Sequence, residues 1–180
     1  MHERRFSGEV ERLRSPERLT ILETNKIIKL SLEGIAAKSL LDIGTGSGLF
    51  AEEFSKKDLN VAGIDVSEEM IKAAKEFVPK GNFKLAVAEE IPFEDKSFDA
   101  SFFGLVFHEV DDMLKALLEA KRVSNKRVLI LEWQYKAGEY GPPLEHRVKP
   151  EQMSKVIKDA GFKNYDKIEL KELVLYRLNL

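Results

Sequence analysis

Hydrophobic and polar positions along the chain follow two different periods. Short apolar runs bounded by glycine, proline or charged residues are typical of buried strands, and apolar residues spaced three or four positions apart between them predict helices. The predicted strands cover 39–43, 59–65, 82–88, 98–104, 126–133, 165–170 and 173–180. This alternation predicts an α/β fold with helices on both faces of a mostly parallel sheet, which ends in an antiparallel hairpin.

The first predicted helix begins at a clear start signal. Ser15 is a capping residue, Pro16 suits the first helical turn, and Glu17 lies near the positive end of the helix dipole. Apolar residues then recur as far as Gly34, which favours one helix of about four turns.

The chain length of 180 residues fits one domain, 1–180. Within it we expect an α/β core over 37–180. The helical segment 1–36 either covers one face of the sheet or forms a lid over the functional site, and the sequence leaves both roles open.

The first strand runs into three alternating glycines, Gly44, Gly46 and Gly48, directly after Asp42. Glycine permits backbone angles that a Cβ would penalise and lets a ligand approach the main chain. A phosphate-binding P-loop would end in Gly-Lys-Ser/Thr, which this turn lacks, and the dinucleotide fingerprint would need glycine or alanine where Leu49 stands. The spacing therefore excludes the first type of site and weakens the second.

The second predicted strand also ends in an acidic residue, Asp65, 21 positions after Gly44. This is close to the offset at which an acidic side chain reaches a ribose in nucleotide-binding α/β folds, and a carboxylate accepts from both ribose hydroxyls. The alternative role, an acid at a helix N-terminus, is already available to Ser67 and its neighbours.

The pattern Asp42-x-Gly44-x-Gly46-x-Gly48 resembles motif I of the class I S-adenosylmethionine-dependent methyltransferases. The resemblance implies a Rossmann-like sheet of seven strands, S-adenosylmethionine as cofactor and S-adenosylhomocysteine as product. It assigns cofactor binding to the residues of this turn, which are Asp42, Gly44, Thr45, Gly46 and Gly48. The segment 141–147 is similar to one in the ubiquinone/menaquinone-biosynthesis methyltransferases of this class.

Two further segments extend the resemblance. Residues 64–70 resemble motif II, in which Val66 or Met70 would pack on the adenine ring. Residues 88–99 resemble the family's A-E-x-L-P-F…S-F-D signature, which lines the adenine pocket. Many relatives carry an aspartate where this chain has Val87, so adenine recognition would fall to Ala88 and Glu89.

The carboxyl end of the fourth predicted strand should lie near the transferred methyl group, because strand ends face the ligand crevice in such folds. This places Phe103, Gly104 and His108 at the site. His108 could act as a general base towards a substrate hydroxyl, or it could be a structural histidine in the turn. The chain lacks the (Asp/Asn)-Pro-Pro-aromatic stretch of enzymes that methylate nucleic-acid bases.

The longest segment without periodicity, 134–149, is expected to form the substrate-side wall, because long loops in compact domains are usually functional. It could equally be a proline-stiffened connector. Aromatic side chains near this edge could line an apolar pocket, although strand alternation turns about half of them away. They are Phe102, Phe103, Phe107, Trp133, Tyr135 and Tyr140.

The composition of the chain limits the kinds of partner that it is expected to bind. With 29 Lys and Arg against 31 Asp and Glu, the net charge of −2 gives no electrostatic footprint for nucleic acid or an anionic membrane. The chain has no cysteine, and its three histidines, His2, His108 and His146, are too scattered to suggest a metal site. Without a membrane span or signal sequence, we expect a cytoplasmic protein, and the Glu- and Lys-rich composition indicates a thermophilic source.

These observations together predict a methyltransferase that moves a methyl group from S-adenosylmethionine to a small-molecule acceptor by in-line displacement. An NAD(P)-dependent oxidoreductase and a non-catalytic S-adenosylmethionine-binding protein are the alternatives. The acceptor, the methylated atom and the oligomeric state are not indicated by the sequence.

Overall fold

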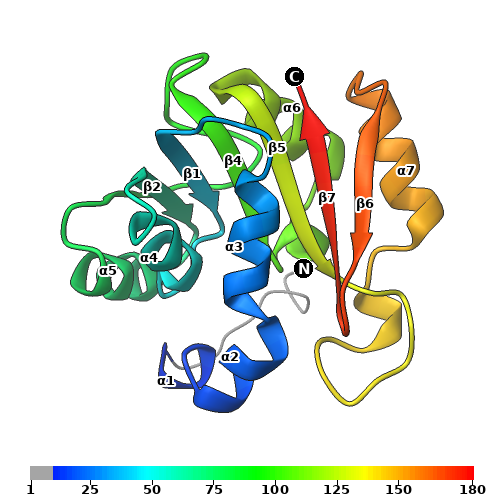
Figure 1. Ribbon diagram of the computed structural model, residues 1–180, viewed down its shortest axis with the longest axis horizontal. Helices are drawn as coiled ribbons and strands as arrows, with labels where there is room; N and C mark the ends of the chain where they lie inside the picture. The colour runs from blue at the N-terminus through cyan, green and yellow to red at the C-terminus, as the bar shows by residue number, and fades with distance from the viewer. Residues whose placement is uncertain (1–9) are drawn as a thin grey trace.

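A computed structural model of the protein, which describes residues 10–180, contains one mixed sheet (Figure 1). Within the described residues the strands are β1 Ser39–Ile43, β2 Asn60–Asp65, β3 Asn82–Leu85, β4 Phe98–Gly104, β5 Ser124–Trp133, β6 Tyr165–Glu169 and β7 Leu173–Asn179. Their order is β3-β2-β1-β4-β5-β7-β6; β1 to β5 pair in parallel, and β7 pairs antiparallel with both β5 and β6. The predicted fold class is confirmed.

Helices cover both faces of this sheet. The helices are α1 Val10–Leu13, α2 Pro16–Leu22, α3 Thr24–Leu32, α4 Leu49–Ser55, α5 Glu68–Phe77, α6 Met113–Val123 and α7 Pro150–Asp159, with short 3-10 turns η1 Phe107–Glu109 and η2 Leu144–His146. The core residues of α3, α4 and α5 pack on one face, and those of α6 and α7 pack on the other. In Figure 1, α3 crosses in front of the sheet while α6 lies behind it.

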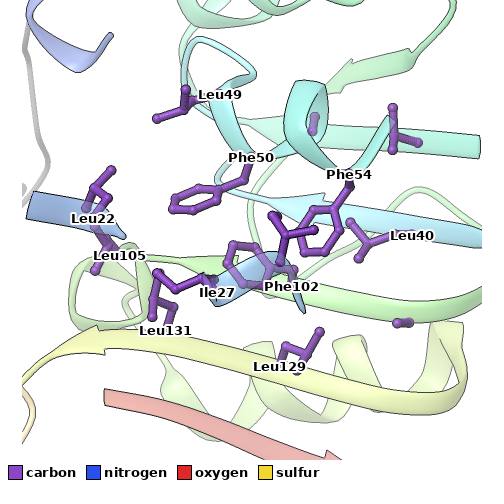
Figure 2. Packing of buried hydrophobic residues seen from close by; sticks show 14 of the residues in the cluster. Leu22, Ile27, Leu40, Leu49, Phe50, Phe54, Phe102, Leu105, Leu129 and Leu131 are labelled. Atoms are coloured by element: carbon purple, nitrogen blue, oxygen red, sulfur yellow. The ribbon is translucent and has the colours of Figure 1, made fainter. Parts of the chain in front are cut away.

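Strand alternation divides the core between the two faces. Leu40 belongs to the cluster under α3 and α4, whereas its neighbour Leu41 belongs to the cluster under α6, because successive side chains of a strand point to opposite faces. Figure 2 shows the first cluster, in which Phe102 of β4 lies among the aromatic rings of α4. Its ring centroid is 4.9 Å from that of Phe50 and 5.2 Å from that of Phe54, distances typical of favourable aromatic pairs.

The prediction of one N-terminal helix of four turns is wrong, because the helix is broken at Glu23. This residue adopts φ 47°, a left-handed conformation that ends α2 and starts α3. Its carboxylate accepts from the Lys171 backbone N–H at 3.2 Å, a bond that ties the break to the loop between β6 and β7. The predicted start is confirmed, since the Ser15 hydroxyl accepts from the Arg18 backbone N–H at 3.3 Å.

The third strand is shorter than predicted. It ends at Leu85 instead of continuing to Ala88, and the last part of the predicted strand, 86–88, runs as a loop along the edge of the sheet. Leu85 and Val87 are 52% and 39% exposed, so the apolar pattern there does not mark a buried strand. The other predicted strands match within about two residues.

Candidate active site

A cavity of about 840 Å³ opens at the carboxyl ends of the parallel strands, where ligands bind in open α/β sheets. The glycine turn after β1, the end of β2 and the loop after β3 line one side of it. Helices α1 and α2, η1 and the loop after β5 line the other side. In Figure 1, α1, α2 and the yellow loop after β5 all lie at this edge of the sheet.

The glycine turn brings backbone to the cavity wall. Gly44 has φ +67°, and a Cβ there would lie 2.5 Å from Cγ2 of Val106, so only glycine fits. The backbone N–H of Thr45 donates to the Ile64 carbonyl at 2.9 Å, which joins the turn to β2. Gly44, Thr45 and Gly46 line the cavity, as predicted for a cofactor-binding turn.

Asp42 lies beneath this turn and does not line the cavity. Its carboxylate is buried and accepts from the Thr45 hydroxyl at 2.7 Å. Burial raises the pKa of Asp42 to about 7, because the interior disfavours the charged form more than the hydrogen bond from Thr45 favours it. Asp42 therefore fixes the turn from below and does not touch a cavity ligand.

Gly48 also lies outside the cavity lining. It precedes α4 with φ +77°, and a Cβ would approach the Cα of Ala74 in α5 to 3.0 Å. Its role is to let two helices pack closely at the end of the turn.

Asp65 faces the cavity at the end of β2. One carboxylate oxygen accepts from the Gly46 backbone N–H at 2.8 Å, and the other accepts from the Ser67 N–H at 3.0 Å. Asp65 also lines the cavity, and a carboxylate oxygen can accept more than one hydrogen bond. Ser67 caps α5 by accepting from the Met70 N–H at 3.3 Å. The alternative role of Asp65, as an acid that caps this helix, is therefore filled by the serine.

The residues predicted for the adenine side are brought together. Val66, Met70, Ala88 and Glu89 all line the cavity, and Val66 is 45% exposed while Met70 is largely buried. One Glu89 oxygen accepts two backbone N–H groups, at 2.8 and 3.0 Å, from residues 111–112 before α6. The other oxygen has no hydrogen bond to the described residues and remains available to a ligand.

His108 lies in η1 and lines the cavity with its ring held from behind by Glu132. The ring Nδ1 is 2.9 and 3.0 Å from the two Glu132 oxygens, and both side chains are buried. Burial lowers the pKa of His108, but the charge and hydrogen bond of Glu132, with a further contribution from Glu109, outweigh it and raise the pKa overall.

Phe103 does not lie at the cavity, so its predicted contact with the site is wrong. Its side chain is wholly buried on the α6 face and packs edge-on against Phe107, with ring centroids 5.0 Å apart. Phe102, on the opposite face, is also core. Gly104, which was also predicted there, does line the cavity, and so does Leu105 after the end of β4, which adopts φ 62°.

The aromatic lining is smaller than the predicted set. Trp133 and Tyr140 line the cavity, whereas Tyr135 does not. Phe50, at the start of α4, lines the cavity although no sequence pattern marked it.

The loop after β5 is fixed by one buried cation. The Arg147 guanidinium donates to the carbonyls of Gln134, Lys136 and Pro142 at 2.9 Å, and also to the carbonyl of Tyr140. Four carbonyls of a loop without regular structure are thereby satisfied by one side chain. The loop supplies the cavity wall with residues 140–143 and His146, as the prediction of a functional loop required.

Besides Phe50, three residues at or beside the cavity were not predicted from the sequence. Glu132 carried a usable signal, because it ends an apolar strand as Asp42 and Asp65 do. Ser47 lines the cavity with a buried hydroxyl that has no hydrogen-bond partner among the described residues, and Arg147 organises the loop; neither carried a pattern.

Residues 41–131 match a known family, described as the methyltransferase domain. The chain belongs to the methyltransferase domain family. The glycine turn, Asp65 and His108 of this methyltransferase domain lie within the matched segment, and Glu132 follows it directly.

Curated relatives of the chain are also named as methyltransferases. The chain is 32% identical over 111 residues to the demethylmenaquinone methyltransferase of Thermotoga maritima, covering 59% of this chain and 48% of that protein. It is 36% identical over 116 residues to the ubiquinone/menaquinone biosynthesis C-methyltransferase UbiE of Geobacter sp. (strain M21), covering 58% and 48%. The chain thus spans about half the length of these curated relatives.

A solved structure matches nearly the whole methyltransferase domain. The crystal structure of a SAM-dependent methyltransferase from Aquifex aeolicus has a TM-score of 0.85 and 28% identity, and the match covers 94% of this chain and 96% of that one. The similarity therefore extends to the N-terminal helices and the C-terminal hairpin, beyond the segment that defines the family.

Two other kinds of feature, a membrane-spanning helix and a metal-binding cluster, are not found in the described residues. No helix in residues 10–180 is long and apolar enough to span a membrane. No group of three or more His, Asp and Glu side chains there is arranged to hold a metal ion. His2, the third histidine, lies outside the described residues.

Proposed function

We propose that the protein transfers a methyl group from S-adenosylmethionine to a small-molecule acceptor, leaving S-adenosylhomocysteine. The observation that carries this proposal is the position of Asp65 at the cavity wall, with its carboxylate fixed by the Gly46 N–H at 2.8 Å. A carboxylate held in this way can bind a ribose, and the adjacent glycine turn admits a ligand to the backbone. The family to which the chain belongs supports the same assignment.

The residues around the glycine turn fit such a cofactor. The buried Ser47 hydroxyl lacks a partner among the described residues, and an unpaired buried hydroxyl is costly unless a ligand completes it. The polar amino-acid end of S-adenosylmethionine would meet this hydroxyl and the cavity-lining backbone of Gly44 and Gly46. When bound, the cofactor supplies a methyl group on a positively charged sulfur that is already a good leaving group.

The adenine end of the cofactor would lie on the side of Asp65 away from the glycine turn, between apolar and polar groups. Val66 and Met70 offer apolar contact, and the free Glu89 oxygen can accept from an amino group. Ala88 would contribute its backbone to the same pocket. This arrangement supplies a hydrogen-bond acceptor even though Val87 stands where many relatives carry an aspartate.

The acceptor would occupy the side of the cavity formed by Trp133, Tyr140 and His108. These aromatic walls and the enclosed volume suit an organic molecule of small size. Two relatives are named for methylation in menaquinone or ubiquinone biosynthesis, which supports an acceptor of this kind. The net charge of −2 gives no reason to expect nucleic acid or membrane as a partner.

In this proposal the enzyme mainly positions its two substrates and excludes water. The N-terminal segment contributes to this in two ways: α3 covers one face of the sheet, and α1 and α2 act as a lid, since they line the cavity. Arg14 holds the lid by donating to the Ser47 carbonyl at 3.1 Å and by lying 3.6 Å above the Phe77 ring. The single-domain organisation, a cytoplasmic location and a thermophilic source stay predictions from the sequence.

Calorimetric titration tests the cofactor first. We expect binding of S-adenosylmethionine and S-adenosylhomocysteine but not of NAD or NADP. Asp65→Ala should weaken that binding about 10- to 100-fold, because a charge-assisted pair of hydrogen bonds to the ribose is lost. Asp159→Ala, on the surface of α7, is the matched control and should bind as the wild type does.

The outcome separates the three candidate functions. Dinucleotide binding alone would favour an oxidoreductase and overturn the proposal. Tight cofactor binding without methyl transfer to any of a broad panel of small acceptors would favour a binding protein. Unchanged affinity in Asp65→Ala would contradict the assignment of the ribose site, provided that circular dichroism shows the variant folded.

A further inference from the structure

The Glu132 carboxylate accepts hydrogen bonds from His108 and from the Trp133 backbone. One of its oxygens accepts from the His108 backbone N–H at 3.0 Å and from the ring Nδ1 at 2.9 Å. The other oxygen lies 3.0 Å from the same Nδ1 and accepts from the Trp133 backbone N–H at 3.1 Å. A buried carboxylate with this many donors holds the imidazole ring in one orientation.

This contact determines which ring nitrogen faces the cavity unprotonated. A carboxylate only accepts, so neutral His108 carries its proton on Nδ1 and leaves a lone pair on Nε2. The nearest charged oxygen to Nε2 is one of Glu109 at 3.6 Å, which is too long for a hydrogen bond. Among the described residues Nε2 therefore has no hydrogen-bond partner, although His108 lines the cavity.

We propose that His108 and Glu132 act as a proton-accepting pair, and that the methyl acceptor presents a weakly acidic hydroxyl group to Nε2. The inference rests on the proposed function and specifies the chemistry of its acceptor. His108 is the catalytic residue in this pair, and Glu132 is a positioning residue that acts through it.

Charged groups on every neighbouring element bear on this pair. Glu132 on β5 and Glu109 on η1 stabilise a protonated imidazole, whereas Arg147 after η2 opposes it. Arg18 on α2 lies close enough to Glu109 to interact with it. The two carboxylates prevail, so the proton that His108 accepts is stabilised by charges already in place.

The proton transfer balances without a further reactant. The O–H bond of the acceptor breaks, its proton moves to Nε2, and its electron pair stays on oxygen, which becomes the nucleophile. After the methyl group is transferred, the proton leaves Nε2 for solvent through the cavity opening. An amine acceptor in its neutral form would already carry its nucleophilic lone pair and would not need this pair of residues.

Binding of para-nitrophenol tests the pair without any cofactor, because its ionised form absorbs visible light. The wild type should bind the phenol as the phenolate at a pH where the free phenol is mostly protonated. Glu132→Gln should reduce phenolate formation about tenfold or more, since a carboxylate partner typically shifts a neighbouring pKa by at least about one unit. His108→Gln should abolish it, and Glu145→Gln, exposed on the neighbouring η2, is the matched control.

A structural histidine would give different results. If the wild type binds the phenol only in its protonated form or not at all, the proposal is wrong. It is also wrong if Glu132→Gln shows the wild-type pH profile of phenolate formation. Nitrogen NMR of His108 is an independent check that does not depend on how well the variants fold, and a neutral ring protonated on Nε2 would overturn the inference.

Calorimetry on the same samples separates this inference from the proposed function. Normal S-adenosylmethionine binding with no phenolate formation would leave the methyltransferase proposal intact and remove the proton-accepting pair. Absence of cofactor binding in the wild type would refute the methyltransferase proposal itself.

Discussion

Replacing Gly44 with alanine should damage both the stability of the fold and the affinity for the cofactor. The residue has φ +67°, and a Cβ there would lie 2.5 and 2.8 Å from the two methyl carbons of Val106 and 2.9 Å from its Cβ. Contacts this short force a backbone or side-chain shift, and the branched valine cannot swing its Cβ away.

The expected cost follows from two separate effects. Alanine in the left-handed region costs about 1–2 kcal/mol, and overpacking of a well-packed site costs about 1–3 kcal/mol. Alanine also lowers the entropy of the unfolded chain, which offsets up to about 1 kcal/mol. The net loss of unfolding free energy should be about 2–4 kcal/mol, or roughly 5–15 °C in melting temperature for a domain of this size.

Urea denaturation of the wild type and three variants can separate these effects. Val106→Ala in the Gly44→Ala background removes the two nearest methyl carbons but keeps the Cβ, so it should recover about 1 kcal/mol and leave the backbone strain. Gly138→Ala is the matched control, because its added Cβ would meet only a Glu172 oxygen at 3.8 Å. Calorimetry on each folded variant then reports the affinity for S-adenosylmethionine.

Wild-type stability and affinity in Gly44→Ala would refute the geometry of the turn. If the double variant is no more stable than Gly44→Ala, the clash with Val106 is not the cause of the loss. A loss as large in Gly138→Ala would show that the assay does not distinguish constrained glycines from unconstrained ones.

Two other substitutions test groups that support the site. Burial raises the pKa of Asp42 from 3.8 to about 7, so between these pH values the folded protein keeps a proton that the unfolded chain releases. The free energy of unfolding therefore falls as the pH rises from about 4 to 7. Asp42→Asn should remove that dependence, a difference on the order of 4 kcal/mol across the range, measured by urea denaturation at each pH; parallel curves for the two proteins would contradict it. Arg147→Lys should cost about 2 kcal/mol or more, because one ammonium cannot reach four carbonyls. Limited proteolysis should then cut within 134–149 faster than in the wild type, and an unchanged cutting rate would show that the loop does not depend on the guanidinium.

Most of the sheet could be predicted from the sequence because β1, β2, β4, β5 and β7 are largely buried and contain long apolar runs. The glycine turn could also be predicted, since the spacing of Gly44, Gly46 and Gly48 excludes a phosphate-binding P-loop and disfavours the dinucleotide fingerprint. The left-handed φ angles of all three glycines agree with the reason for which glycine was expected there.

Tertiary contacts determined what the local pattern could not. The N-terminal helix is broken at Glu23, whose carboxylate accepts from the Lys171 backbone N–H across 148 positions of sequence, and no local signal marks that partner. Phe103 was placed at the cavity because it lies near the carboxyl end of β4, where ligands bind in such folds, but its side chain points into the core on the α6 face. The rings of Phe102 and Phe103 are both core, and the cavity meets β4 only at its end.

Three strands of the sheet show one sequence pattern, an apolar run with an acidic residue at or near its end, yet the three carboxylates have different positions and partners. Asp42 is buried under the glycine turn, Asp65 faces the cavity with the turn's amide fixed to it, and Glu132 holds the ring of His108. All three lie at the same edge because parallel strands end together. What distinguishes them is the partner that folding brings to each. The pattern therefore predicts the edge of the sheet at which these carboxylates gather, and only the folded chain shows which one faces the cavity and which one contacts a neighbouring side chain.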